Sequence, residues 1–153
     1  MKKLITLFAV LLFAQVQLNA QSTNQEYDSV LAKKLNADSY GMKKYYFVML
    51  KKGPSGITDS ARLDSIFRGH MKNIQLLASQ NKLVVAGPLG ENDKAYEGIF
   101  ILNTDSKTEA EKMLEADTAI KLKLLTAEYY LLYSSAALQQ TFELHKKIEK
   151  THF

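Results

Sequence analysis

The sequence of 153 residues contains no cysteine and no tryptophan, and it has only two prolines and seven glycines. Without cysteine the chain has no disulfide bond, no CxxC redox motif and no lipid-modified cysteine behind an N-terminal signal. Its stability must therefore come from a packed hydrophobic core. A single domain of this length can supply one, so one domain is expected.

Charge of one sign is not concentrated anywhere in the chain. The formal net charge is +4, and the two arginines and many lysines are scattered among acidic residues. No aromatic and basic motif of an RNA-binding sheet occurs, which argues against a nucleic acid partner. Phosphate loops, dinucleotide fingerprints and nucleophile elbows are also missing, and His145 and His152 lack the spacing of metal ligands. We therefore expect no cofactor and no metal.

Residues 1–20 have the plan of a secretory signal peptide. Two lysines precede an apolar run from Leu4 to Val16, and the small residue Ala20 stands at a cleavage point. The run is too short for a membrane span, because glutamine and asparagine residues interrupt it. An uncleaved anchor is the alternative, since Leu18 is a poor residue three positions before the cut. We predict a periplasmic or secreted chain that begins near Gln21 and keeps no membrane segment.

Hydrophobic periodicity predicts four strands and two helices in the order β-α-β-β-α-β. The expected strands are residues 44–51, 82–88, 98–103 and 128–135, and the expected helices are residues 59–81 and 106–117. Asn81 is suited to the left-handed end of the first helix, and Ser106 and Glu109 have the spacing of a capping box. Right-handed crossovers then place both helices on one face of a four-stranded antiparallel sheet, an α+β, ferredoxin-like fold.

The opposite face of this expected sheet is apolar as well. In the first strand Tyr45, Phe47 and Met49 alternate with Tyr46, Val48 and Leu50, so neither face is polar. A homodimer that packs two sheets face to face would cover the open face. The alternative is an intramolecular cover by residues 26–37 and 138–148, which have weak helical stripes. We expect the dimer, because neither segment is long or apolar enough to hide four strands.

Four blocks of the sequence carry a resemblance: "YYFVMLKKGP", "RGHMKNIQLLASQNKLVVAGPLG", "GIFILNTDSKTEAEKML" and "ADTAIKLKLLTAEYYLLYSSAAL". Together they resemble the YCII-related (YciI-like) domain family, dimeric α+β barrel proteins. The resemblance covers residues 43–138. It divides the chain into a signal peptide (1–20), a linker with a short helix (21–42), the YCII-related domain (43–138) and a helical C-terminal tail (139–153).

The resemblance also implies an active site. The family's His and Asp pair corresponds to His70 and Asp117, and its ending of the second strand corresponds to Gly87 and Pro88. Three positions depart from the family pattern. Asp117 is followed by threonine where the family usually has proline, a family glycine is replaced by Lys123, and a late His-Pro-Trp block is replaced by residues 130–132.

The residues themselves allow a structural and a functional interpretation of each candidate. The expected helix 59–81 has an apolar stripe, which consists of Leu63, Ile66, Phe67, Met71, Ile74, Leu77 and Ala78. His70 lies at the centre of this stripe, so its ring should face the protein, either as a general acid or base or as a core histidine bonded to a backbone carbonyl. Asp117 would orient it, or would start a turn as a solvated carboxylate. The candidate substrate contacts are Arg68, Tyr46, Gly87 and Pro88. The alternative for Arg68 is a solvated side chain, and the alternative for Tyr46 is an aromatic that only packs.

Two candidate functions therefore remain. The first is a cofactor-independent lyase, isomerase or dehydrohalogenase in which Asp117 orients His70, and His70 moves a proton on a small organic molecule. The second is a non-catalytic exported domain that binds a small ligand or serves as a dimeric accessory protein. The His and Asp pair favours the first function, and the replaced family positions favour the second.

Overall fold

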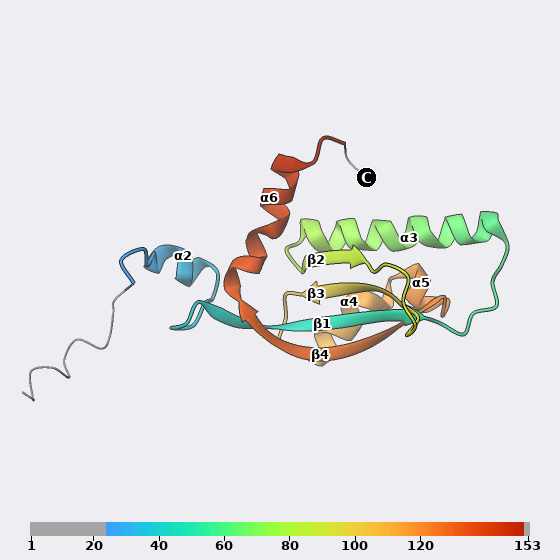
Figure 1. Cartoon of the computed structure of the whole chain (residues 1–153), viewed down its shortest axis with the longest axis horizontal. Coiled ribbons are helices and arrows are strands. Elements are labelled where there is room, and N and C mark those ends of the chain that lie inside the picture. Colours follow the sequence, from blue (N-terminus) through green and yellow to red (C-terminus); the bar gives the residue numbers. More distant parts are fainter. Residues whose placement is uncertain (1–23, 152–153) are drawn as a thin grey trace, which may run out of the picture.

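The computed structural model describes residues 24–151, which form one antiparallel sheet with helices packed on it (Figure 1). The signal peptide expected at residues 1–20 lies outside the described residues. No helix within residues 24–151 is long and apolar enough to cross a membrane. The elements are α2 (Ser29–Lys34), β1 (Met42–Lys52), α3 (Ser60–Ser79), β2 (Leu83–Pro88), β3 (Tyr96–Leu102), α4 (Lys107–Glu115), α5 (Thr118–Lys121), β4 (Leu125–Ser135), the 3₁₀ helix η2 (Ala136–Gln140) and α6 (Thr141–Ile148).

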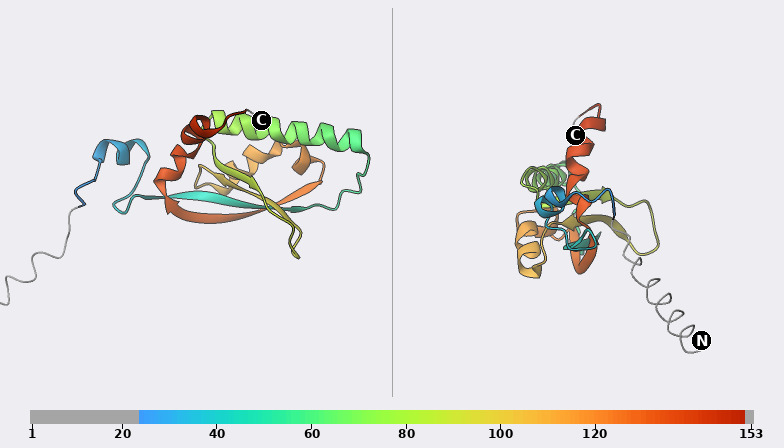
Figure 2. Two further views of the ribbon diagram at one scale, coloured as in Figure 1. Left: turned by 45° about the horizontal axis from the view of Figure 1, so that its top comes forward. Right: turned by 90° about the vertical axis from the view of Figure 1, so that its left-hand side faces the viewer.

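The sheet has the strand order β2-β3-β1-β4, and all neighbouring strands are antiparallel. β1 is central and pairs with β4 along its whole length, from Met42 opposite Ser135 to Lys52 opposite Leu125. The end-on view shows α3 and α4 on the same side of the sheet (Figure 2). The predicted α+β fold, with a four-stranded antiparallel sheet and both crossover helices on one face, is confirmed.

The hydrophobic core lies between this sheet face and the helices. Alternate residues of the strands point toward the helices, as the two-residue period of a strand requires. Val48 and Leu50 from β1 and Phe100 and Leu102 from β3 are all at most 3% exposed. The helices contribute Ile66, Leu77, Ala110, Met113, Leu114 and Ala119 to the same cluster. Burying each of the larger side chains contributes roughly 1.5–3 kcal/mol.

The opposite sheet face is covered at one end only. Tyr45 is fully buried there, and its hydroxyl donates a hydrogen bond to the Ser135 carbonyl oxygen at 3.0 Å. Burial raises the pKa of Tyr45 to about 12, against a smaller opposing effect of the Gln139 side chain. η2 contacts β1 and β2, and α6 contacts β2. Beyond this end, Phe47 and Met49 are only half-buried within the single chain.

The helix ends follow the predicted capping residues, with two differences. Ser106 accepts a hydrogen bond from the Glu109 backbone N–H at 3.3 Å, and Asn81 takes the left-handed conformation (φ 54°) just after α3. The expected capping box is only half formed, because the Glu109 carboxylate accepts from the Thr104 hydroxyl and the Ser106 N–H donates to the same hydroxyl oxygen. The second helix, however, does not run to Asp117 as expected. It ends at Glu115, and Asp117 begins the separate four-residue helix α5 as its N-cap. The side chain of Asp, Ser, Thr or Asn at an N-cap accepts hydrogen bonds from backbone N–H groups that have no partner within the helix. Asp117 does this for α5, so a second helix begins directly after it.

Lys123 occupies a backbone conformation that suits glycine. Its φ is 57°, in the left-handed region, at the end of α5. Its carbonyl oxygen accepts a hydrogen bond from the Ser55 N–H at 3.0 Å, and a Cβ at Gly53 would lie only 2.1 Å from that oxygen. This conformation is therefore held by the packing of the turn after β1. It costs a non-glycine residue about 1–2 kcal/mol.

We predict that Lys123→Gly stabilises the protein by about 0.5–1 kcal/mol, because glycine removes the left-handed strain but adds freedom to the unfolded chain. Lys121→Gly is the matched control. Lys121 is the last residue of α5, and glycine there should destabilise by up to about 1 kcal/mol. Urea unfolding of the two variants measures both changes. Equal destabilisation by both would show that the backbone at Lys123 is not strained.

Candidate functional site

His70 faces the protein interior from the middle of α3. Four buried residues of this helix recur every three or four positions, as one helix face requires: Ile66, His70, Asn73 and Leu77; Ala78, next to Leu77, is buried as well. His70 is 8% exposed, which confirms the predicted orientation of its ring. The buried face is narrower than the sequence pattern indicated. Phe67 and Met71 belong to the predicted apolar stripe but lie outside the buried helix face: their exposed fractions are 47% and 38%.

Asp117 is fully buried and holds the histidine ring. The His70 Nδ1 atom lies 2.7 Å from Asp117 Oδ2, and Asp117 Oδ1 accepts hydrogen bonds from the backbone N–H groups of Ala119 (3.0 Å) and Ile120 (3.3 Å). The interpretation of Asp117 as a solvated carboxylate is therefore wrong, although it does start the turn into α5. A buried carboxylate without partners would cost several kcal/mol, and here both oxygens have partners. The capping bonds thereby fix the direction in which Oδ2 points.

Two aromatic rings flank His70. The Phe100 ring of β3 stacks on it at 5.8 Å between centroids, and the Phe67 ring meets it edge-on at 6.3 Å. No buried polar side-chain atom among the described residues lacks a hydrogen-bond partner. The hydrogen bond at Nδ1 is the only one that His70 makes within the described residues, so its Nε2 atom is not fully enclosed by them and keeps some contact with solvent. The ring is thus held on one edge and open at the other nitrogen.

Gly69 lets α3 come close enough for this contact. A Cβ at Gly69 would lie 2.1 Å from Thr118 Oγ1 and 2.9 Å from Thr118 Cβ. No side chain fits there without moving the two helices apart. Sequence reasoning did not single out this glycine. The available signal was its position inside a helical pattern, where an isolated glycine usually has a packing or functional reason.

The other candidate residues do not join the pair. Arg68 is exposed on α3, and Tyr46 is half-buried against the hydrophobic core. Gly87 and Pro88 end β2, where they pair with Ile99 and Gly98 of β3. None of these four residues takes part in the hydrogen bonds or ring contacts of His70 and Asp117. The structure therefore brings together the two proposed catalytic residues but not the proposed substrate contacts.

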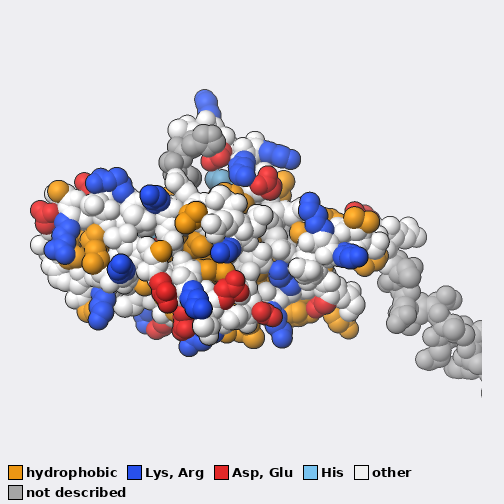
Figure 3. Space-filling model, turned by 180° about the vertical axis from the view of Figure 1, so that it is seen from behind, with side chains coloured by type: hydrophobic (Ala, Val, Ile, Leu, Met, Phe, Trp, Pro, Cys, Tyr) orange, Lys and Arg blue, Asp and Glu red, His pale blue; other side chains and the backbone are white. Residues whose placement is uncertain are grey.

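The cavities lie elsewhere. Two cavities in residues 24–151 are lined by other side chains: one of about 550 Å³ lies at the start of β1 and α4, and one of about 280 Å³ lies in the loop between β2 and β3. Neither is lined by His70 or Asp117. Within the same residues, no group of three or more histidine, cysteine or acidic side chains could hold a metal ion. On the side of the molecule seen in Figure 3, basic and acidic side chains are intermingled, and small apolar areas lie between them.

Comparison with known proteins gives a distant similarity to a solved structure. No protein-family model and no curated protein matches the sequence. Among solved structures, the chain is similar to 5-chloro-2-hydroxyhydroquinone dehydrochlorinase (TftG) from Burkholderia phenoliruptrix AC1100, determined in complex with 2,5-dihydroxybenzoquinone. The TM-score is 0.39 and the sequence identity 24%, over 57% of this chain and 90% of that chain. A similarity at this level bears on neither activity nor substrate.

We predict that Gly69→Ala destabilises the protein by about 1–3 kcal/mol, because the added methyl group overpacks the contact with Thr118. In a helix without this contact, the same change would stabilise by roughly 0.5–1 kcal/mol. The sign of the effect therefore tests the close approach. Gly56→Ala is the control, since a Cβ at Gly56 meets nothing within 4 Å. A stabilising Gly69→Ala in urea unfolding would refute the contact that positions His70.

Proposed function

We propose that this protein is a cofactor-independent acid–base enzyme in which His70 moves a proton on a small organic molecule. The observation that carries the proposal is the 2.7 Å hydrogen bond between His70 Nδ1 and the buried Asp117 carboxylate, combined with an Nε2 atom that reaches solvent. An acid–base histidine needs one nitrogen held and the other free. Lyase, isomerase and dehydrohalogenase reactions all use such a proton transfer.

The geometry assigns a role to each partner. Asp117 accepts the Nδ1–H of His70, so the neutral ring carries its proton on Nδ1 and presents a lone pair at Nε2. Nε2 then takes a proton from an activated C–H or O–H group of the substrate. The positive charge that forms on the ring is stabilised by the Asp117 carboxylate, and the same nitrogen returns the proton to the product. Phe100 and Phe67 keep the ring plane fixed while this happens.

One observation favours the second function, a non-catalytic domain that binds a small ligand or acts as an accessory protein. A catalytic histidine requires a space for substrate beside it, whereas His70 is only 8% exposed and the two cavities described above are lined by other residues. In that case the pair would be a structural link between α3 and α5. The two functions differ in whether Nε2 exchanges protons with a bound carbon acid.

We also propose membership of the YCII-related family, on the blocks of sequence that resemble it and on the pairing of His70 with Asp117.

Export to the periplasm or the medium is proposed from the sequence of residues 1–20 alone. A homodimer is proposed from the sheet face opposite α3 and α4, where Phe47, Met49, Ile99 and Ile101 are half-buried within one chain. Pairing of identical faces about a two-fold axis is the commonest way to bury such a surface.

The proton-transfer proposal is tested by hydrogen–deuterium exchange at carbon. The protein is incubated in D₂O with a panel of small cyclic ketones and hydroxylated aromatic acids, and NMR follows the loss of C–H signals. We expect exchange in at least one compound, reduced by a factor on the order of 10²–10⁴ in His70→Gln. Asp117→Asn, which keeps the N-cap, should also slow exchange. Arg62→Gln, on the exposed start of α3, should not.

Exchange that proceeds equally in the wild type and in folded His70→Gln would exclude His70 as the proton carrier. Absence of exchange across the panel, together with saturable binding of one of its members, would favour the ligand-binding domain.

The homodimer has a separate test. Light scattering at micromolar concentration should give twice the mass of one chain. Phe47→Glu should shift the protein to a monomer, because it places a charge at the centre of the open face. Leu76→Glu is the control, since Leu76 is 50% exposed on α3 and away from that face. A monomeric wild type would mean that the tail cover at the Tyr45 end suffices and that no second sheet is needed.

A further inference from the structure

The larger cavity lies at the end of α4 opposite to Asp117. Its volume is about 550 Å³, and the loop before β1, the start of β1, the loop after β3 and the end of β4 surround it. Glu109, in the first turn of α4, is part of its wall, whereas Asp117 follows the last turn. The nine residues of α4 span about 13 Å. The cavity is therefore separate from the His70 and Asp117 pair.

Lys43 is a partly buried cation in this wall without an anion at contact distance. Its Nζ donates to the neutral side-chain oxygens of Asn103 (2.7 Å) and Gln139 (3.4 Å). No ion pair of Lys43 or Lys44 occurs among the described residues; the five ion pairs there involve other side chains. Burial lowers the pKa of Lys43, and the more distant Asp105 raises it. The same Nζ atom lies over the Tyr45 ring, 5.3 Å from its centroid. An ammonium group has three N–H donors, of which the two hydrogen bonds use two.

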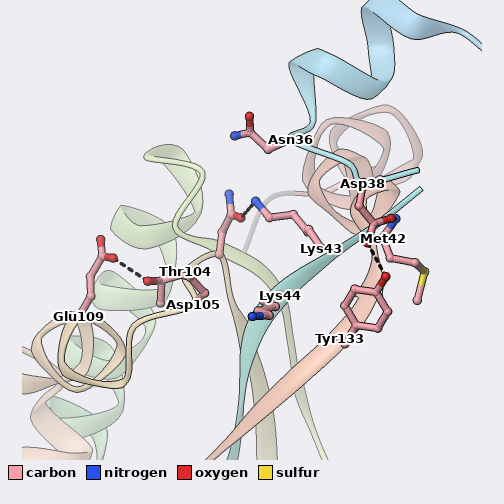
Figure 4. Close-up of a pocket in the computed structure, with 10 residues that line it drawn as sticks. Asn36, Asp38, Met42, Lys43, Lys44, Thr104, Asp105, Glu109 and Tyr133 are labelled. Carbon is pink, nitrogen blue, oxygen red and sulfur yellow. Dashed lines mark hydrogen bonds between the residues drawn. The ribbon is translucent and has the colours of Figure 1, made fainter. Parts of the chain in front are cut away.

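Carboxylates stand on both sides of the two lysines (Figure 4). On one side, Glu109 accepts a hydrogen bond from the Thr104 hydroxyl at 2.6 Å, next to Asp105. On the other side, Asp38 accepts from the Tyr133 hydroxyl and from two backbone N–H groups, which lower its pKa. The side chains and backbone groups that donate to Glu109 and Asp38 are neutral, and neither carboxylate is in an ion pair within the described residues. Cationic and anionic groups thus share one small concave surface.

We infer that this cavity binds a small zwitterion of the amino acid class. The ligand's carboxylate lies against Lys43 and Lys44, and its ammonium group lies against Asp105 and Glu109. A dianion such as phosphate meets three carboxylates and is repelled. A simple monocarboxylate leaves the acidic wall unmatched, and an amine leaves the lysines unmatched. Only a molecule with both charges completes the electrostatic complement.

A segment before the block that resembles the YCII-related family lines this cavity, and the tail after the block supports it. Asn36 and Asp38 precede the block and are lining residues. Gln139 follows the block and contacts two lining residues: its oxygen accepts hydrogen bonds from Lys43 and Asn103, and its nitrogen donates to the Leu35 (2.7 Å) and Ala136 (3.0 Å) carbonyl oxygens. The amide thus connects the N-terminal segment, β1 and the tail behind the cavity.

NMR titration of the ¹⁵N-labelled protein with L-alanine tests the inference. Propionate and ethylammonium are the matched probes, because each lacks one of alanine's two charges, and inorganic phosphate is the dianion. We expect saturable shifts of the backbone amides of residues 43–44 and 103–105 with alanine, and affinities at least about tenfold weaker for the other three probes. Lys43→Met and Lys44→Met should each weaken alanine binding about tenfold or more. Lys72→Met, an exposed position on α3, should leave it unchanged.

Lys44 is exposed, so Lys44→Met keeps the test valid if Lys43→Met fails to fold. Equal binding of propionate or phosphate would make this a simple anion site and overturn the inference. Absence of saturable shifts with alanine would overturn it as well. Alanine binding that survives Lys44→Met and Asp105→Asn would place the ligand elsewhere.

Discussion

The close approach of α3 to the start of α5 is the constraint on which the candidate active site depends. Gly69 has no side chain, so the two helices meet at Thr118, and the adjacent residues His70 and Asp117 come within hydrogen-bond distance. The short helix α5 contributes the other half of the arrangement. Its first N–H groups hold one oxygen of Asp117 and leave the other for the ring. Backbone geometry thus aims a buried carboxylate at a histidine 47 residues earlier in the chain.

Much of the fold follows from local patterns in the sequence. Alternating apolar residues in the strands, the capping residue Ser106 and the helix-ending Asn81 each act over a few residues, and each is where the sequence indicated. The split between α4 and α5 was missed, because four residues are too few for a helical period to show. The exposure of Phe67 was missed for a different reason. How wide a helix face becomes buried depends on the angle at which the helix packs, which periodicity does not record.

The same distinction applies to the site. The central position of His70 on an apolar stripe indicated that its ring faces inward, but its partner came only from resemblance to a family, since contacts distant in sequence leave no local signal. The cavity at Lys43 had no signal of either kind. Its residues come from loops and strand ends that the fold alone brings together, and the Gln139 amide that contacts two of them, Lys43 and Asn103, lies in a tail with only a weak helical pattern.

The two sites lie at opposite ends of α4 and differ in chemistry. One is a buried His and Asp pair between aromatic rings, suited to proton transfer, and the other is an open cavity with charges of both signs.

Both the enzyme and the accessory-domain interpretation depend on how the imidazole is held, so the protonation of the ring at each nitrogen is the central claim. Long-range ¹H–¹⁵N NMR of the His70 side chain measures it directly. A neutral ring protonated at Nδ1, with Nε2 unprotonated, is the result that the hydrogen bond to Asp117 requires; a neutral ring protonated at Nε2 would contradict it.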